Sequence, residues 1–78
     1  MATILAVDDE QPILELIKNG LQKDGHMVTG YVSAEQVPLN SLNRYDLIIL
    51  DIMMPGMDGF SFCEKIRSIV DCPILFLT

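Results

Sequence analysis

The chain has 78 residues, of which 50% are hydrophobic and 21% are charged, and its formal net charge at pH 7 is −6. This length allows at most one small domain, and the apolar fraction excludes a disordered polypeptide. The acidic charge balance argues against a nucleic-acid-binding surface in this segment.

The first part of the chain predicts a strand, a helix and a second strand. Residues 4–7 are continuously apolar, as in a buried strand. Pro12 suits the first turn of a helix over residues 12–23, and Gly25 suits its end. Helical spacing places four apolar residues on one face of this helix, namely Ile13, Leu14, Ile17 and Leu21. Residues 27–31 are predicted to form a short second strand.

The second part continues the alternation. Residues 33–36 resemble a capping box that opens a second helix, but Pro38 follows in its early interior, so we expect that helix to be short or irregular. Residues 47–50 predict a third strand, and Asp58 suits the N-cap of a third helix. The inner face of that helix is predicted to contain Phe62, Ile66, Ile69 and Val70. A fourth strand is predicted at residues 74–77.

The sequence shows neither a targeting signal nor a cysteine motif. Met1-Ala2-Thr3 lacks the basic flank of a signal peptide, and no apolar run approaches the length of a membrane span. Cys63 and Cys72 are too few and too far apart for a disulfide framework or a C-x-x-C motif. We therefore expect reduced thiols in a cytoplasmic protein that does not contact a membrane.

Strands and helices that alternate, with unbroken apolar strands, predict a parallel sheet covered on both faces. Ligands of such sheets bind beyond the carboxyl ends of the strands. Three carboxylates and one hydroxyl follow strand ends in this sequence, and they belong to Asp8, Asp9, Asp51 and Thr78. Because these carboxylates repel one another, a shared pocket needs a cation. Oxygen ligands favour a hard ion such as Mg²⁺, and no His or Cys in these segments favours zinc.

Four segments resemble the receiver domains of bacterial two-component response regulators, in that family's order and at its spacing. The segments are residues 5–10 (LAVDDE), 45–51 (YDLIILD), 54–59 (MPGMDG) and 73–78 (PILFLT). The resemblance implies an α/β, flavodoxin-like, doubly wound parallel sheet with central strand order 2-1-3-4-5, the order known for this fold. It also implies that residues 1–78 are the N-terminal part of a receiver domain, with four strands and three helices. The fifth strand, the last two helices and an output domain are expected to be missing.

The resemblance also implies roles for individual residues. Asp51 is similar to the family's phosphoacceptor, and Thr78 to the switch hydroxyl that contacts the bound phosphoryl group. Mg²⁺ would be bound by Asp51, directly by Asp9, by Asp8 through water, and by the backbone carbonyl of Met53. The chemistry agrees, because a carboxylate nucleophile forms an acyl phosphate and a cation neutralises the phosphoryl oxygens.

Simpler interpretations of the same residues stay open. Asp51 is also compatible with a plain strand end, Asp8 and Asp9 with capping of the first helix, and Thr78 with an ordinary strand terminus. The family's lysine on the fifth strand is expected to be missing, and none of the five basic residues is placed to substitute for it.

Three functions compete at this point. The first is a phosphorylation-controlled signalling switch, not an enzyme, which takes its phosphoryl group from a sensor histidine kinase. Its parent protein would be a transcriptional regulator that reaches DNA only through the missing output domain. The second is a phosphorylation-independent fragment that self-associates, as a homo-oligomer or a strand-exchanged dimer, through the open edge of the fourth strand. The third is an aspartyl-nucleophile phosphohydrolase. Met53 argues against it, because haloacid-dehalogenase-like enzymes place an aspartate at that position.

Overall fold

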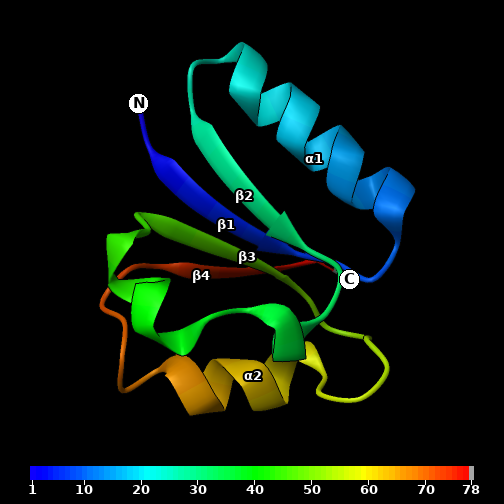
Figure 1. Cartoon of the computed structure of the whole chain (residues 1–78), viewed down its shortest axis with the longest axis vertical. Helices are drawn as coiled ribbons and strands as arrows, with labels where there is room; N and C mark the ends of the chain where they lie inside the picture. The colour runs from blue at the N-terminus through cyan, green and yellow to red at the C-terminus, as the bar shows by residue number, and fades with distance from the viewer. Residues whose placement is uncertain (78) are drawn as a thin grey trace.

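A computed structural model describes residues 1–77 as a four-stranded parallel sheet with helices on both faces (Figure 1). The strands are β1 (Thr3–Val7), β2 (Met27–Tyr31), β3 (Leu47–Asp51) and β4 (Ile74–Leu77), in the order β2-β1-β3-β4. All three strand pairs are parallel. This order confirms the flavodoxin-like sheet for the four strands that were predicted.

The central strands divide the core into two layers. In β1, Leu5 and Val7 pack into the larger buried cluster, whereas Ile4 and Ala6 pack into a smaller one. In β3, Ile48 and Leu50 join the larger cluster. Because successive side chains point to opposite faces, unbroken apolar strands are what a sheet covered on both faces requires.

Helix α1 (Gln11–Lys23) covers β1 and β2 on one face of the sheet (Figure 1). Its predicted start and end are confirmed, with Pro12 in the first turn and Gly25 at a φ of 90° just beyond the end. Leu14 is buried, and Ile17 and Leu21 pack against the same cluster. The prediction was wrong for Ile13, which is 39% exposed at the edge of the covered face.

The connection from β2 to β3 contains two short 3-10 helices, η1 (Ala34–Gln36) and η2 (Leu39–Arg44). The prediction of a short or irregular helix is confirmed, and Pro38 lies at the N-cap of η2. The predicted capping box was wrong, because Ser33 makes no side-chain cap hydrogen bond. The N–H of Gln36, which the Ser33 side chain would accept in a capping box, donates instead to the backbone carbonyl of Ser33, as a 3-10 turn requires.

Helix α2 (Gly59–Ile66) lies on the opposite face of the sheet from α1 (Figure 1). Its N-cap is confirmed, since Asp58 Oδ1 accepts a hydrogen bond of 2.7 Å from the N–H of Ser61. Phe62 and Ile66 are buried as predicted. Ile69 is 38% exposed and was wrongly placed on the inner face, because the helix ends before it.

Strand β4 forms one edge of the described sheet. Its central residue Leu75 is 53% exposed, on the face opposite to α2. The ring of Phe76 packs against that of Phe60 with centroids 5.0 Å apart. Within residues 1–77, no helix has the length and apolar character needed to cross a membrane.

Candidate functional site

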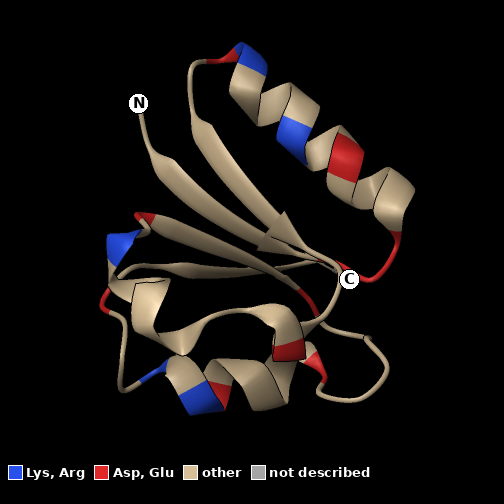
Figure 2. Cartoon of the chain, viewed as in Figure 1, with Lys and Arg blue, Asp and Glu red and all other residues tan. Residues whose placement is uncertain are grey.

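Three carboxylates meet at the carboxyl end of the two central strands. Asp8 and Asp9 follow β1, and Asp51 is the last residue of β3. The parallel register pairs Val7 with Leu50, so the residues that follow them lie side by side. One carboxylate oxygen from each aspartate lies within 4.8 Å of the others. Figure 2 shows acidic residues both where β1 leads into α1 and at the end of β3.

The three aspartates differ in burial and in their hydrogen bonds. Asp8 is only 3% exposed, and its Oδ1 accepts a hydrogen bond of 2.9 Å from the N–H of Glu10. Asp51 is half-buried, and its Oδ1 accepts one of 3.2 Å from the N–H of Met53. Asp9 is exposed. Each of the two hydrogen-bonded carboxylates therefore has its orientation fixed by its own loop.

A surface hollow of about 400 Å³ opens beside these carboxylates. Its lining comes from the ends of β1, β3 and β4 and from the start of α1, through Asp8, Glu10, Ile13, Asp51, Met53 and Leu77. The side chain of Met53 is 83% exposed. The hollow gives a small anionic ligand room to reach Asp51 from solvent.

The donor set fits a hard divalent cation. Carboxylate oxygens are the ligands that Mg²⁺ takes in proteins, and Mg²⁺ usually keeps several waters and takes one or two carboxylates. A buried carboxylate beside two others is electrostatically unfavourable unless a positive charge lies close by. The sequence prediction that Asp8, Asp9 and Asp51 lie together is borne out by their positions. Thr78 lies outside the described residues, so its role stays a prediction.

Gly59 brings α2 directly against the backbone of Asp51, a role that the sequence analysis missed. A Cβ built at Gly59 would overlap the backbone carbonyl oxygen of Asp51. The N–H of Gly59 also donates a hydrogen bond of 2.9 Å to the carbonyl of Ile52. The glycine after Asp58 in the motif is the signal that a close backbone approach was needed there.

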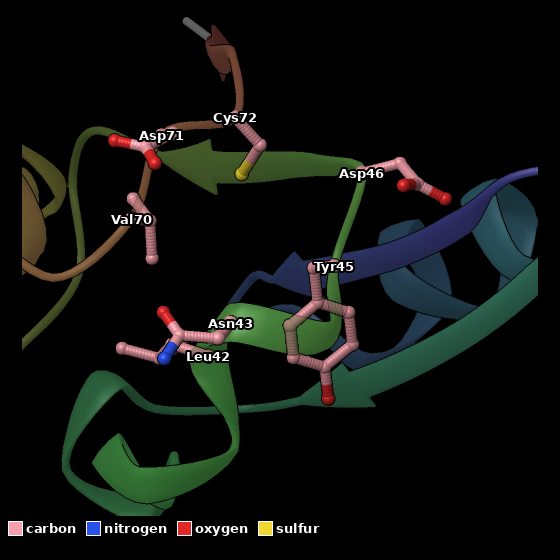
Figure 3. A pocket seen from close by; sticks show the side chains of 7 residues that line it. All are labelled: Leu42, Asn43, Tyr45, Asp46, Val70, Asp71 and Cys72. Carbon is pink, nitrogen blue, oxygen red and sulfur yellow. The ribbon is translucent and has the colours of Figure 1, made fainter.

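A second hollow, of about 460 Å³, lies at the opposite end of β3 (Figure 3). It is lined by residues that precede β3 and by residues that precede β4, which are Leu42, Asn43, Tyr45, Asp46, Val70, Asp71 and Cys72. Burial raises the pKa of the Cys72 thiol, and the carboxylates of Asp46 and Asp71 raise it further. In the part of the chain that the structure describes, only Asp8, Asp9 and Asp51 bring three ligand atoms within reach of one metal ion.

Comparison with protein families decides the identity of the domain. The sequence model of the response regulator receiver domain matches residues 4–78, which is nearly the whole chain. The chain belongs to the response regulator receiver family. The acidic cluster at the strand ends is therefore the cluster of a two-component receiver domain.

Known receivers and regulators resemble this chain in sequence and in structure. The transcriptional regulatory protein SpaR of Bacillus subtilis is 55% identical over 78 residues, which cover 100% of this chain and 36% of SpaR. The N-terminal domain of a response regulator receiver protein from Methanoculleus marisnigri JR1 superposes with a TM-score of 0.90 at 34% identity, covering 100% of this chain and 67% of that one.

A further solved structure resembles this chain and contains a ligand. The response regulator protein TrrA of Thermotoga maritima, solved in complex with Mg²⁺-BeF, has a TM-score of 0.83 at 37% identity. The superposition covers 97% of this receiver and 70% of TrrA. The present chain thus spans about a third of the regulator SpaR and about two thirds of the solved receivers.

Proposed function

We propose that this receiver is a phosphorylation-controlled switch in which Asp51 accepts a phosphoryl group from a sensor histidine kinase in the presence of Mg²⁺. The observation that carries the proposal is the meeting of Asp8, Asp9 and Asp51, with one oxygen of each within 4.8 Å of the others. The hollow beside them gives the donor access to Asp51.

In the proposed reaction, a carboxylate oxygen of Asp51 attacks the phosphorus, the phosphorus–nitrogen bond of the kinase phosphohistidine breaks, and an acyl phosphate forms. Asp9 and Asp51 would bind Mg²⁺ directly, Asp8 through water, and Met53 through its backbone carbonyl. When bound, Mg²⁺ supplies positive charge that offsets the charge on the phosphoryl oxygens. The N–H of Met53 holds one oxygen of Asp51, which leaves the other free to react. Thr78 would contact the phosphoryl group through its hydroxyl.

Two relatives support this proposal. TrrA, which was solved in complex with Mg²⁺-BeF, supports magnesium as the cation of this receiver. SpaR is a transcriptional regulatory protein, which supports a parent protein with a DNA-binding output domain outside residues 1–78. We expect the protein to act in the cytoplasm, where a histidine kinase presents its phosphoryl group.

The proposed role is that of a switch and not of an enzyme that turns over a substrate. Met53 occupies the position at which haloacid-dehalogenase-like phosphohydrolases carry their acid–base aspartate. A methionine side chain cannot transfer a proton to a leaving group. The acyl phosphate would therefore lack the acid–base catalyst with which those phosphohydrolases turn over their intermediate.

A direct phosphorylation experiment tests the proposal. The chain, and a longer version that continues into the rest of the receiver, are incubated with Mg²⁺ and acetyl phosphate, and the intact mass is measured. We expect a phosphoryl adduct that is lost at alkaline pH and that Asp51→Asn abolishes. Asp46→Asn is the matched control, because Asp46 precedes the other end of β3. A longer protein that never gains an Asp51-dependent adduct would contradict the switch.

The exposed edge of β4 favours a second candidate function for the 78-residue chain, which is self-association. Leu75 is 53% exposed there and Phe60 is 55% exposed beside Phe76. An unpaired apolar strand edge pairs readily with another chain. We expect a homo-oligomer or strand-exchanged dimer by size-exclusion chromatography with light scattering. A folded monomer at high concentration would rule this out.

A further inference from the structure

A side chain from a distant part of the sequence holds the loop between β3 and α2. Glu35, on η1, accepts a hydrogen bond through Oε2 from the backbone N–H of Met57, at 3.1 Å. The two residues are 22 positions apart in the sequence. Within residues 1–77, no other hydrogen bond ties residues 53–57 to a segment other than β3.

The Glu35 carboxylate also lies against the preceding residue of the loop. Gly56 has a φ of +75°, and a Cβ built there would lie 2.6 Å from Oε2 of Glu35. A left-handed backbone and a close carboxylate both require glycine at this position. Glu35 therefore contacts two consecutive residues of the loop.

The base of Glu35 is fixed even though its side chain is exposed. Ala34, the first residue of η1, and Val37, the residue after it, are buried in the larger core cluster with exposures of 3% and 5%. Their burial ties η1 to the α2 side of the sheet. A hydrogen bond from Glu35 therefore fixes the loop relative to the core and not merely relative to another loop.

The same loop begins at the acidic cluster. Met53 donates its N–H to Asp51, lines the hollow, and leaves its side chain 83% exposed, so this side chain cannot anchor the backbone. The anchors that follow are the buried side chain of Met54 and the Glu35 contact at Gly56 and Met57. Glu35 is therefore one of two anchors, together with Met54, that hold the backbone between Asp51 and the cap of α2.

We propose that Glu35 is a positioning residue for cation binding at the cluster of Asp8, Asp9 and Asp51. It holds residues 53–57 in the conformation that keeps the backbone carbonyl of Met53 available to the cation. The inference rests on the proposed function, in which this carbonyl is a Mg²⁺ ligand. It adds a residue that touches neither the cation nor the phosphoryl group.

The test compares Glu35→Ala and Glu35→Gln with Gln36→Ala, an exposed neighbour on the same short helix. Mg²⁺ is titrated while backbone amide NMR signals of Asp9 and Met53 are followed. We expect Glu35→Ala to weaken Mg²⁺ binding by about threefold to tenfold. Glu35→Gln retains most of the affinity, since its amide oxygen still accepts a hydrogen bond. Gln36→Ala leaves the affinity unchanged.

A second readout needs no metal. Without Mg²⁺, the amide of Met57 should exchange with solvent faster in Glu35→Ala than in the wild type, and Gln36→Ala should not alter it. If Glu35→Ala fails to fold, Glu35→Asp supplies the same comparison, because its side chain is too short to reach Met57. Equal Mg²⁺ affinity in the wild type and the folded variant would overturn the positioning role of Glu35 and leave the proposed metal site intact. A wild-type protein that binds no Mg²⁺ would refute the metal site, and the inference with it.

Discussion

An aspartate flanks β3 at each end, and each lines a surface hollow of similar size. Asp46 precedes the strand beside a hollow of about 460 Å³, and Asp51 ends it beside one of about 400 Å³. Asp46 completes the hydrogen bonding between β3 and β1: its N–H donates to the carbonyl of Thr3, and its Oδ2 accepts from the N–H of Thr3 at 2.8 Å. Asp51 instead lies among other carboxylates.

The difference shows that neighbours, not residue type or cavity size, make a candidate site. In a parallel sheet, all strands deliver their carboxyl ends to one edge, where each loop begins close to the next. The carboxylate of Asp46 is occupied by a backbone N–H and serves the sheet. Asp51 also accepts a backbone N–H, from Met53, but it lies beside two further carboxylates whose like charges a bound cation would offset.

The largest expected difference between the two ends is in metal binding. Asp9→Asn replaces a proposed direct ligand and should weaken Mg²⁺ binding about a hundredfold, whereas Asp46→Asn should leave it unchanged. Isothermal titration calorimetry of both variants measures this difference. Equal losses in the two variants would place the metal elsewhere or make the effect one of overall charge.

The close approach of α2 predicts the next largest effect, on stability. Gly59→Ala should lower the free energy of unfolding by about 2 kcal/mol, because the new Cβ overlaps the backbone of Asp51. Gly20→Ala is the matched control, since nothing lies within 4 Å of a Cβ there, and it should raise stability by roughly 0.5 kcal/mol. Urea denaturation measures both. A neutral Gly59→Ala would show that α2 can move away from the site.

Substitutions at the amino end of β3 should lower the free energy of unfolding by less than Gly59→Ala does. Asp46→Ala removes the acceptor for the N–H of Thr3 and should lower the free energy of unfolding by about 1 kcal/mol. Asp46→Asn keeps an acceptor oxygen and should lower it less. Thermal unfolding of the two variants tests this order. Equal losses in the two variants would mean that the charge of Asp46, and not its hydrogen bond, is what stabilises this end.

The two ends also differ in how much of them the sequence predicted. Apolar runs that end in Asp8 and Asp51 predicted both the strands and the meeting of their carboxylates, because strand direction alone places them at one edge. The contact between Glu35 and Met57 was not predictable, because it spans 22 residues and depends on how η1 packs. Local pattern also failed at Ser33, where the chain forms a 3-10 turn in place of an α-helix.

A smaller effect follows from repulsion within the acidic cluster. Without Mg²⁺, Asp9→Asn removes one of three neighbouring negative charges and should raise the free energy of unfolding by roughly 0.5 kcal/mol. With saturating Mg²⁺ the order should reverse, because the wild type gains more binding energy than the variant. Thermal unfolding with and without Mg²⁺ tests the sign in each condition. A variant that is less stable in both conditions would mean that Asp9 is structural.

The smallest expected effect concerns Cys72, at the amino end. Burial raises the pKa of its thiol above the ordinary value of 9.0, the carboxylates of Asp46 and Asp71 act in the same direction, and a backbone hydrogen bond opposes them. The folded chain therefore keeps this proton to a higher pH than the unfolded chain. The contribution of the protonated Cys72 thiol to the stability of the folded chain is therefore fully present below pH 9.0, and it is lost as the pH rises above that value.

The measurement is the difference in unfolding free energy between the wild type and Cys72→Ala, followed from neutral to alkaline pH. The difference should stay constant in the neutral range and then shift against the wild type above pH 9.0. Asp46→Asn should reduce that shift, since it removes one of the charges that raise the pKa of the thiol. A difference that moved in favour of the wild type at alkaline pH would mean that Cys72 is more readily ionised in the folded chain. In that case the hollow at the amino end of β3 would stabilise the thiolate anion, which is the opposite of what the carboxylates of Asp46 and Asp71 should do.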